Sequence, residues 1–206
     1  MKLFAFIIFF LSNILIAFSQ SGNPVPAEIQ LWLFTDFQKS TSPYSYGIFA
    51  FKKKEITTDL RFQYENSKTI SINSGQSFYI SAFDSLEILP QLGITIDKES
   101  FGANFTLTTN YAKGRFECYT QSLLTNCFNN DAFFFNWIEG SFYLSPEKIK
   151  IGIAEQVYVP FNADDGYKQF GFLVGCAIKK TVQPAVYIFS PFSHMRRVSV
   201  FVFIGF

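Results

Sequence analysis

Strand-like segments follow one another along almost the whole chain, and this pattern constrains the fold more than any other feature of the sequence. Asn104, Thr106 and Thr108 alternate with Phe105 and Leu107, which is the two-residue period of a strand with one solvated face. Residues 28–34 carry apolar side chains on both faces, so we expect that strand to be covered on both sides. More than ten such segments, about 8–12 residues apart and without a sustained helical period, predict an all-β, single-domain antiparallel β-sandwich or jelly roll.

Glycine, asparagine and proline mark several expected chain reversals. Residues 73–76, Asn-Ser-Gly-Gln, have the composition of a hairpin turn, because Asn and Gly tolerate positive φ. Gly140 separates the strand-like segments 133–139 and 141–144 and predicts a second hairpin. Residues 84–89 are expected to form one helical turn that ends before Pro90.

The first nineteen residues have the organisation of an export signal. Lys2 supplies a positive start, residues 3–18 form an apolar run, and Ala17 and Ser19 are the small residues of a cleavage site. We expect cleavage after Ser19, which leaves residues 20–206 as one secreted, extracellular domain. An uncleaved anchor helix is the alternative, but sixteen residues fall short of the roughly 20 that span a bilayer. No later apolar run is longer, so no stable membrane span is expected.

Composition limits the possible partners and cofactors. Lysine and arginine number 17 and aspartate and glutamate 16, a net charge of +1, so no strong field attracts the chain to nucleic acid. There is one histidine and no spacing typical of a zinc site. We therefore predict no nucleic-acid partner, no metal and no cofactor.

Motifs of the common catalytic classes are absent. There is no P-loop, no Gly-x-Ser-x-Gly elbow and no Gly-x-Gly-x-x-Gly. His194, the one histidine, lies in a polar break that favours an exposed loop residue over a general base. Asp84, Glu117, Glu139 and Glu155 lie in or beside apolar strands and are the candidates for a carboxylate pair of the glycoside-hydrolase kind. We predict no catalytic residues, with a small secreted glycosidase-like enzyme as an alternative.

The three cysteines fit an oxidising compartment. Cys118 and Cys127 enclose eight residues, and their proximity in the chain predicts a disulfide. Cys176 then remains unpaired and is interpreted as a small buried apolar residue, although a bridge from Cys176 to either of the others stays open.

Asn104-Phe105-Thr106 is the single N-glycosylation sequon. The alternation puts Asn104 and Thr106 on the face opposite Phe105, so we expect a glycan on the outer surface if the exported chain is eukaryotic. The alternative is an unmodified strand asparagine.

The excess of aromatic residues, 28 Phe, 10 Tyr and 2 Trp, is the most unusual feature of the composition. In the segment 133–137, Trp137 shares a face with Phe133 and Phe135, while Asn136 lies on the other face. We expect the Asn136 face to be nearer water and Trp137 to point inward. Exposed rings suit sugar stacking or a protein partner, so the leading function is a secreted, non-catalytic recognition module, with carbohydrate as first-choice ligand. The second is a secreted structural or assembly protein, a possible homo-oligomer, that self-associates through its aromatic surface. No ligand-binding residues are singled out.

Overall fold

The computed structural model describes residues 27–38, 43–62, 69–80, 85–96, 101–127, 132–145, 149–162, 166–178, 181–192 and 196–206. The predicted export signal, Asp84 and His194 lie outside these residues. The strands are β1 (Ala27–Gln38), β2 (Tyr44–Lys53), β3 (Ile56–Phe62), β4 (Ile70–Gln76), β5 (Phe78–Ile80), β6 (Ser85–Ile96), β7 (Phe101–Lys113), β8 (Phe116–Cys127), β9 (Phe133–Ser145), β10 (Ile149–Pro160), β11 (Tyr167–Cys176), β12 (Val182–Phe189) and β13 (Arg197–Gly205).

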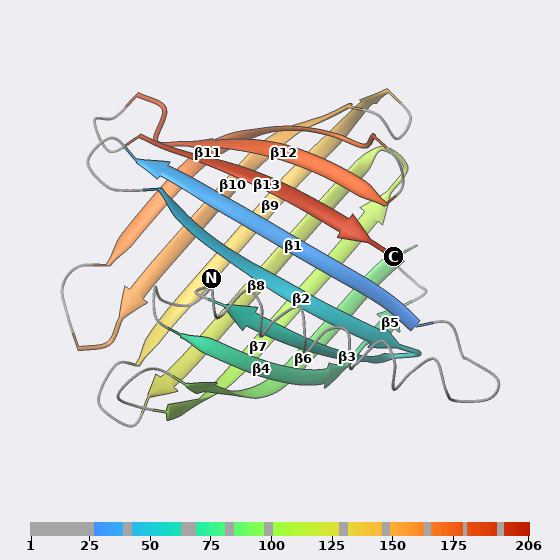
Figure 1. The fold of residues 1–206 in the computed structure, drawn as a ribbon. Helices are drawn as coiled ribbons and strands as arrows, with labels where there is room; N and C mark the ends of the chain where they lie inside the picture. Colours follow the sequence, from blue (N-terminus) through green and yellow to red (C-terminus); the bar gives the residue numbers. More distant parts are fainter. Residues whose placement is uncertain are drawn as a thin grey trace.

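All these strands belong to one antiparallel sheet that closes on itself. Apart from β4 and β5, which do not pair with each other, each strand pairs with its neighbours in the chain. In addition, β1 pairs with β13 and β4 pairs with β6. The short strand β5 continues β4 along β6 in an unchanged register, since Gly75 faces Gln91 and Phe78 faces Ile88. The wall is therefore a closed barrel with twelve strand positions, of which β4 and β5 share one. Figure 1 shows β1, β2 and β13 on the near side and β7 to β10 behind them.

The predicted β-sandwich or jelly roll is wrong, because a single sheet encloses the interior. Alternation with a period of two residues shows that a strand has two different faces. The alternation is the same in a β-sandwich and in a β-barrel, so it does not distinguish the two folds. What separates them is the pairing that closes the sheet, here between residues 70–75 and 91–96. Closure pairs the two strands that would otherwise be sheet edges.

A short break separates β4 from β5 opposite a proline. Pro90 has no backbone N–H to donate, and the β4–β6 ladder stops at the adjacent Gly75–Gln91 pair. At the break, the backbone N–H of Ser77 donates instead to the carbonyl oxygen of Glu55 at 2.7 Å. The proline thus interrupts one strand of the wall without opening the barrel.

Three local predictions from the sequence are wrong because the strands are longer than expected. Residues 73–76 lie inside β4 rather than in a turn, residues 85–89 begin β6 rather than a helical turn, and Gly140 lies within β9. Ladder bonds on both sides hold these residues extended, which overrides their turn propensity. At Gly152 of β10, glycine is also required by space, since a Cβ there would lie 2.3 Å from the carbonyl oxygen of Gly140.

The chain enters and leaves the barrel at the same end, which we call the terminal end. β1 begins and β13 ends there, and Gln30 pairs with Gly205. Connections at this end include two of two residues, 54–55 and 114–115. At the opposite end, residues 63–69 separate β3 from β4 and residues 190–196 separate β12 from β13. Short turns at the end with the termini and longer loops at the other are typical of membrane β-barrels.

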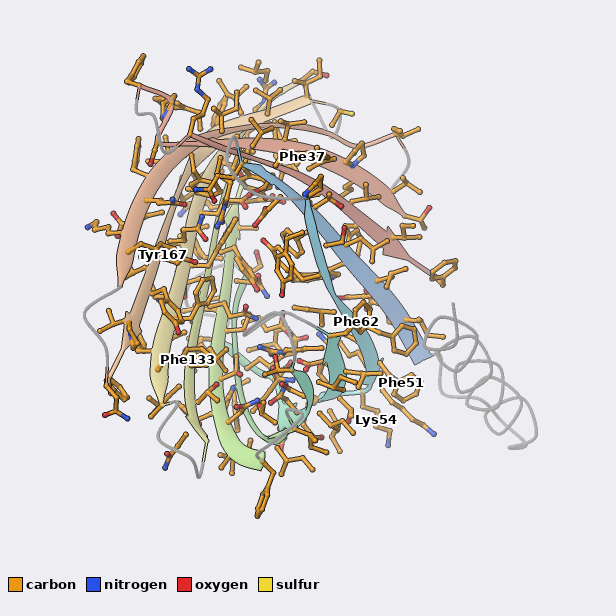
Figure 2. All side chains as sticks on the ribbon, turned by 60° about the vertical axis from the view of Figure 1, so that its left-hand side comes forward. Phe37, Phe51, Lys54, Phe62, Phe133 and Tyr167 are labelled. Carbon is orange, nitrogen blue, oxygen red and sulfur yellow. The ribbon has the colours of Figure 1, made fainter. Side chains whose placement is uncertain are left out.

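The polarity of the barrel is inverted relative to a water-soluble protein. In β7, the inward-facing side chains of Asn104 and Thr106 are 2% and 0% exposed, whereas the outward-facing Phe101 and Phe105 are 63% and 42% exposed. Figure 2 shows side chains filling the enclosed space and others projecting outward, with Phe37 and Phe51 toward opposite ends. The same outward pattern continues around the barrel: Leu33, Ile72, Leu92, Ile94, Leu124, Ile138, Phe142, Ile151, Ile153, Phe172, Val174, Val186, Ile188 and Val200 are all exposed.

Charge is almost absent from this outer surface. Away from the strand ends, the charged residues at outward positions of the described strands are Glu155 and Lys168. Their side chains pair with each other at 3.0 Å. None of the described residues forms a helix long and apolar enough to cross a membrane.

Candidate functional site: the barrel lumen

Aromatic side chains from opposite walls meet inside the barrel. Trp32 of β1 and Tyr119 of β8 have ring centroids 5.7 Å apart, although β1 and β8 are six strand positions apart in either direction. Phe34 of β1 also meets Trp137 of β9 edge-on at 6.3 Å. We call these four residues the aromatic layer. Side chains, rather than the circumference of the wall, therefore set the width of the lumen at this level.

Trp137 is fixed in the aromatic layer by its neighbours on the lumen side. Tyr187 and Phe189 of β12 lie edge-on to its ring at 5.2 and 5.5 Å, and its side chain is 5% exposed. The prediction that Trp137 points inward is confirmed. The expectation that the Asn136 face is nearer water is wrong, because Asn136 faces the apolar exterior, where its Nδ2 donates to Ser122 Oγ at 2.8 Å.

A buried ion pair forms the polar wall of the lumen at β3. The guanidinium of Arg61, which is fully buried, donates to both carboxylate oxygens of Asp59 at 2.9 and 3.0 Å. Asn73 of β4 and Gln91 of β6 donate to the same carboxylate at 2.8 and 2.9 Å. The network connects three neighbouring strands and neutralises both charges.

A second charge cluster lies toward the terminal end, between β2 and β6. Lys52 Nζ lies 2.7 Å from Glu87 Oε1 and donates to the hydroxyl of Tyr79 at the same distance. Ser77 and Asn110 also donate to the Glu87 carboxylate, at 2.7 and 3.2 Å. The lysine and the carboxylate are thus held by several partners as a neutral pair.

The third cluster lies on β8, β9 and β10. Lys150 Nζ is 3.0 Å from Glu139 and 4.0 Å from Glu117. Tyr187 donates its hydroxyl to Glu139 at 2.7 Å, and Tyr143 donates to Glu117 at 3.1 Å. Of the four carboxylates considered as catalytic candidates, the structure brings these two together around one lysine, and it puts Glu155 on the outer surface.

A fourth ion pair lies beyond the aromatic layer, toward the end opposite the termini. Arg197 Nε is 3.5 Å from Asp36 Oδ2, and its guanidinium lies over the ring of Phe189 at 5.2 Å. Ser199 also donates to Asp36. With this pair, each of the cations at inward strand positions of the described chain lies within 4.0 Å of a carboxylate: Lys52, Arg61, Lys150 and Arg197.

A cavity of about 500 Å³ occupies the terminal half of the lumen. Trp32, Tyr119 and Phe203 line it with aromatic rings, and the Lys52–Glu87 and Glu139–Lys150 pairs lie in its wall. We call this cavity the chamber. Its size is within the ~300–1,000 Å³ typical of small-molecule sites.

The predicted disulfide is wrong. Cys118 is a free thiol. It lies in the same extended strand as Cys127, and the two cysteines pair with different residues of β7, Cys118 with Tyr111 and Cys127 with Gly102. Nine residues of extended strand separate their Cα atoms by about 30 Å, far beyond the ~7 Å that a disulfide allows. Cys176 is also free, and it is exposed rather than buried.

Asn104 does not lie on the outer surface as predicted. Its side chain is buried in the lumen beside Asn73, whose Oδ1 accepts from Asn104 Nδ2 at 3.4 Å. Asn104 is therefore part of the buried polar wall on the lumen side.

The residues that the sequence analysis missed are the cations and rings of the lumen. The sequence does contain a signal for the charged residues of β3, because Thr57, Asp59 and Arg61 alternate with Thr58, Leu60 and Phe62. Buried charges on the face opposite half-buried leucine and phenylalanine indicate an inside-out strand. The cross-lumen contact of Trp32 with Tyr119 has no local signal, because it depends on closure of the barrel.

No family model and no curated protein matches the chain. Solved structures do match in fold. A KdgM porin in complex with disordered oligogalacturonate is 9% identical, with a TM-score of 0.63 over 86% of this chain and 99% of that one. The NanC porin is 5% identical, with a TM-score of 0.59 over 86% and 98%. An outer membrane channel from Pseudomonas putida F1 is 9% identical, with a TM-score of 0.52 over 90% and 97%.

These matches show that the chain is similar in fold to porin barrels. A free, secreted carbohydrate-recognition module is therefore wrong as a prediction of function and location, and the secreted location of its two alternatives is wrong as well. The apolar exterior of a closed, porin-like barrel overturns them, as it does the expectation of no stable membrane span.

Proposed function

We propose that the chain is an integral β-barrel of an outer-membrane type, and that its lumen is a narrow channel for small neutral glycans. The observation that carries the proposal is the inverted polarity of the wall. Aliphatic and aromatic side chains are exposed on the outside while the ion pairs are buried within, and such a surface is stable in lipid rather than in water. A twelve-residue strand such as β1 is about 40 Å long, which at a tilt of about 40° spans a bilayer core of roughly 30 Å.

Outward-facing rings near both ends of the wall support the same placement. Phe116 and Phe142 form a cross-strand pair near the terminal end, and both are exposed. Phe37 and Phe101 are exposed near the other end. Aromatic girdles at the two interfaces are typical of barrels that cross a membrane.

The charges of the lumen favour a neutral solute. The KdgM porin was solved in complex with oligogalacturonate, which is a polyanion. Binding of a polyanion requires cations that are not already paired with carboxylates. In the present lumen, each inward-facing cation is already paired with a carboxylate, and the intervening wall carries amides, hydroxyls and rings. These groups suit the hydroxyls and the apolar ring faces of uncharged sugars.

Residues 1–19 fit this location as an export signal. The apolar run after Lys2 and the small residues Ala17 and Ser19 would direct the chain across the inner membrane before the barrel assembles. Cleavage after Ser19 remains our proposal for the start of the mature chain.

Reconstitution tests the function directly. The purified, refolded full barrel is incorporated into lipid vesicles, and osmotic swelling is followed in isosmotic xylose, glucose, maltose and sodium glucuronate. We expect the protein to resist carbonate extraction, swelling to slow as the neutral sugars grow, and glucuronate to enter more slowly than glucose. A chain that stays in the aqueous phase overturns the membrane location. Inserted protein that admits none of these sugars overturns the channel.

A further inference from the structure

We propose that the chamber is a binding site for a neutral hexose unit, and that Trp32 Nε1 and Ser141 Oγ bond its hydroxyls. The inference rests on the proposed function for access, because a solute that passes along the lumen crosses this cavity.

The chamber is closed on one side by the aromatic layer. It extends from the Phe34–Trp137 contact toward the terminal end, and Trp32 and Tyr119 lie in its wall. Phe201 and Phe203 of β13 hold the Trp32 indole from the side at 6.3 and 6.2 Å, both edge-on. The indole is therefore fixed before any ligand arrives, which limits the entropy lost on binding.

Two polar atoms in this wall have no hydrogen-bond partner in the described part of the chain. They are the indole Nε1 of Trp32 and the hydroxyl of Ser141, and both atoms are buried. Ser141 as a whole is only 3% exposed. A buried donor without a partner is costly, so these atoms point to a ligand that offers oxygen atoms.

The remaining wall groups favour a hydroxylated ligand over an anionic one. Lys52 neutralises Glu87, and Lys150 is shared by Glu139 and Glu117, which also lines the chamber, so the wall offers no unpaired cation to an anionic ligand. The carboxylate oxygens can still accept bonds from ligand hydroxyls, since an ionised carboxylate has about four acceptor positions. Aromatic rings beside such acceptors bind the apolar face and the hydroxyl rim of a sugar ring together.

The two tryptophans of the chain provide the measurement. The sequence contains Trp32 and Trp137 and no other tryptophan, and both line the chamber. In a Trp137→Phe background, the emission of Trp32 alone reports occupancy. Glucose and maltose are titrated into the folded barrel in an amine-oxide detergent, because maltoside detergents carry the test ligand. Glucuronate is the anionic counterpart.

We expect saturable changes in emission with the neutral sugars and weaker binding of glucuronate. Ser141→Ala in that background, and Trp32→Phe with Trp137 retained as the reporter, should each raise the Kd about three- to tenfold. Ser74→Ala is the matched control, because Ser74 faces outward from β4 and bonds Thr58 Oγ at 3.0 Å. It should leave the Kd unchanged.

The outcomes separate the site from the channel. No saturable change with either neutral sugar overturns the site, as does a Kd that neither lumen variant alters. Vesicle swelling without saturable binding also overturns the site and leaves the channel in place. Saturable binding without swelling keeps the site and overturns the channel. Heat-modifiable migration on gels confirms that each variant is folded before it is titrated.

Discussion

The side chains of Trp32 and Tyr119 extend from opposite walls of the barrel, and the centroids of their rings lie 5.7 Å apart. Their strands, β1 and β8, are as distant in the wall as two strands of this barrel can be. A barrel of twelve strand positions is wider than the eight-stranded barrels that side chains just fill, so long aromatic side chains are needed to bridge it. This contact constricts the lumen at the level of the aromatic layer.

Shortening both bridging rings should widen the lumen at that level. We expect Trp32→Ala with Tyr119→Ala to raise single-channel conductance in planar bilayers several-fold, because the pair obstructs the lumen from opposite sides. The matched control replaces Phe105 and Phe172, outward-facing rings that are 42% and 46% exposed, with alanine. The control should conduct like the parent. Equal conductance of the lumen variant and the parent would show that another layer limits flow.

Trp137→Ala should lower the free energy of unfolding by about 3–5 kcal/mol. The indole is buried among Phe34, Tyr187 and Phe189, and its removal leaves a void that rigid strands cannot collapse to fill. Denaturant unfolding of the barrel in lipid vesicles measures the change. Phe172→Ala, on the lipid-facing side, should cost much less. A Trp137→Ala barrel as stable as the parent would mean that the ring does not support the wall.

The Asp59–Arg61 pair should behave as a unit. Asp59→Asn leaves a fully buried guanidinium without its carboxylate, which typically costs about 3–5 kcal/mol. The double variant with Asp59→Asn and Arg61→Gln removes both charges and should recover most of that loss. Unfolding in vesicles and a double-mutant cycle give the coupling. Additive effects of the two substitutions would contradict a coupled pair.

Sequence alone predicted the all-β class and the approximate positions of most strands, because alternation is a local property. It also predicted correctly that Trp137 points inward. It did not show which face of each strand meets water, since an alternating pattern is unchanged when inside and outside are exchanged. That symmetry explains the errors at Asn104 and Asn136.

The candidate site was less predictable than the fold. Lys52 and Glu87 are separated by 35 residues, and the aromatic layer joins β1 to β8 and β9. Such contacts exist only after β4 pairs with β6 and the sheet closes. The one local indication was the alternation of Thr57, Asp59 and Arg61 with apolar neighbours, and it is significant only when the outer face is known to be exposed.

The last prediction separates a membrane barrel from a water-soluble one at a single position. Phe172 lies at the middle of β11 with its side chain outward and 46% exposed. In water, an exposed Phe172→Arg substitution changes stability by about 0.5 kcal/mol or less. Facing lipid near the bilayer midplane, it should cost about 2–4 kcal/mol, measured by unfolding in vesicles. Phe192→Arg is the control, because Phe192 is 97% exposed in the connection after β12 and its arginine would remain hydrated. If both variants match the parent, the outer face of β11 does not contact lipid and the membrane assignment fails.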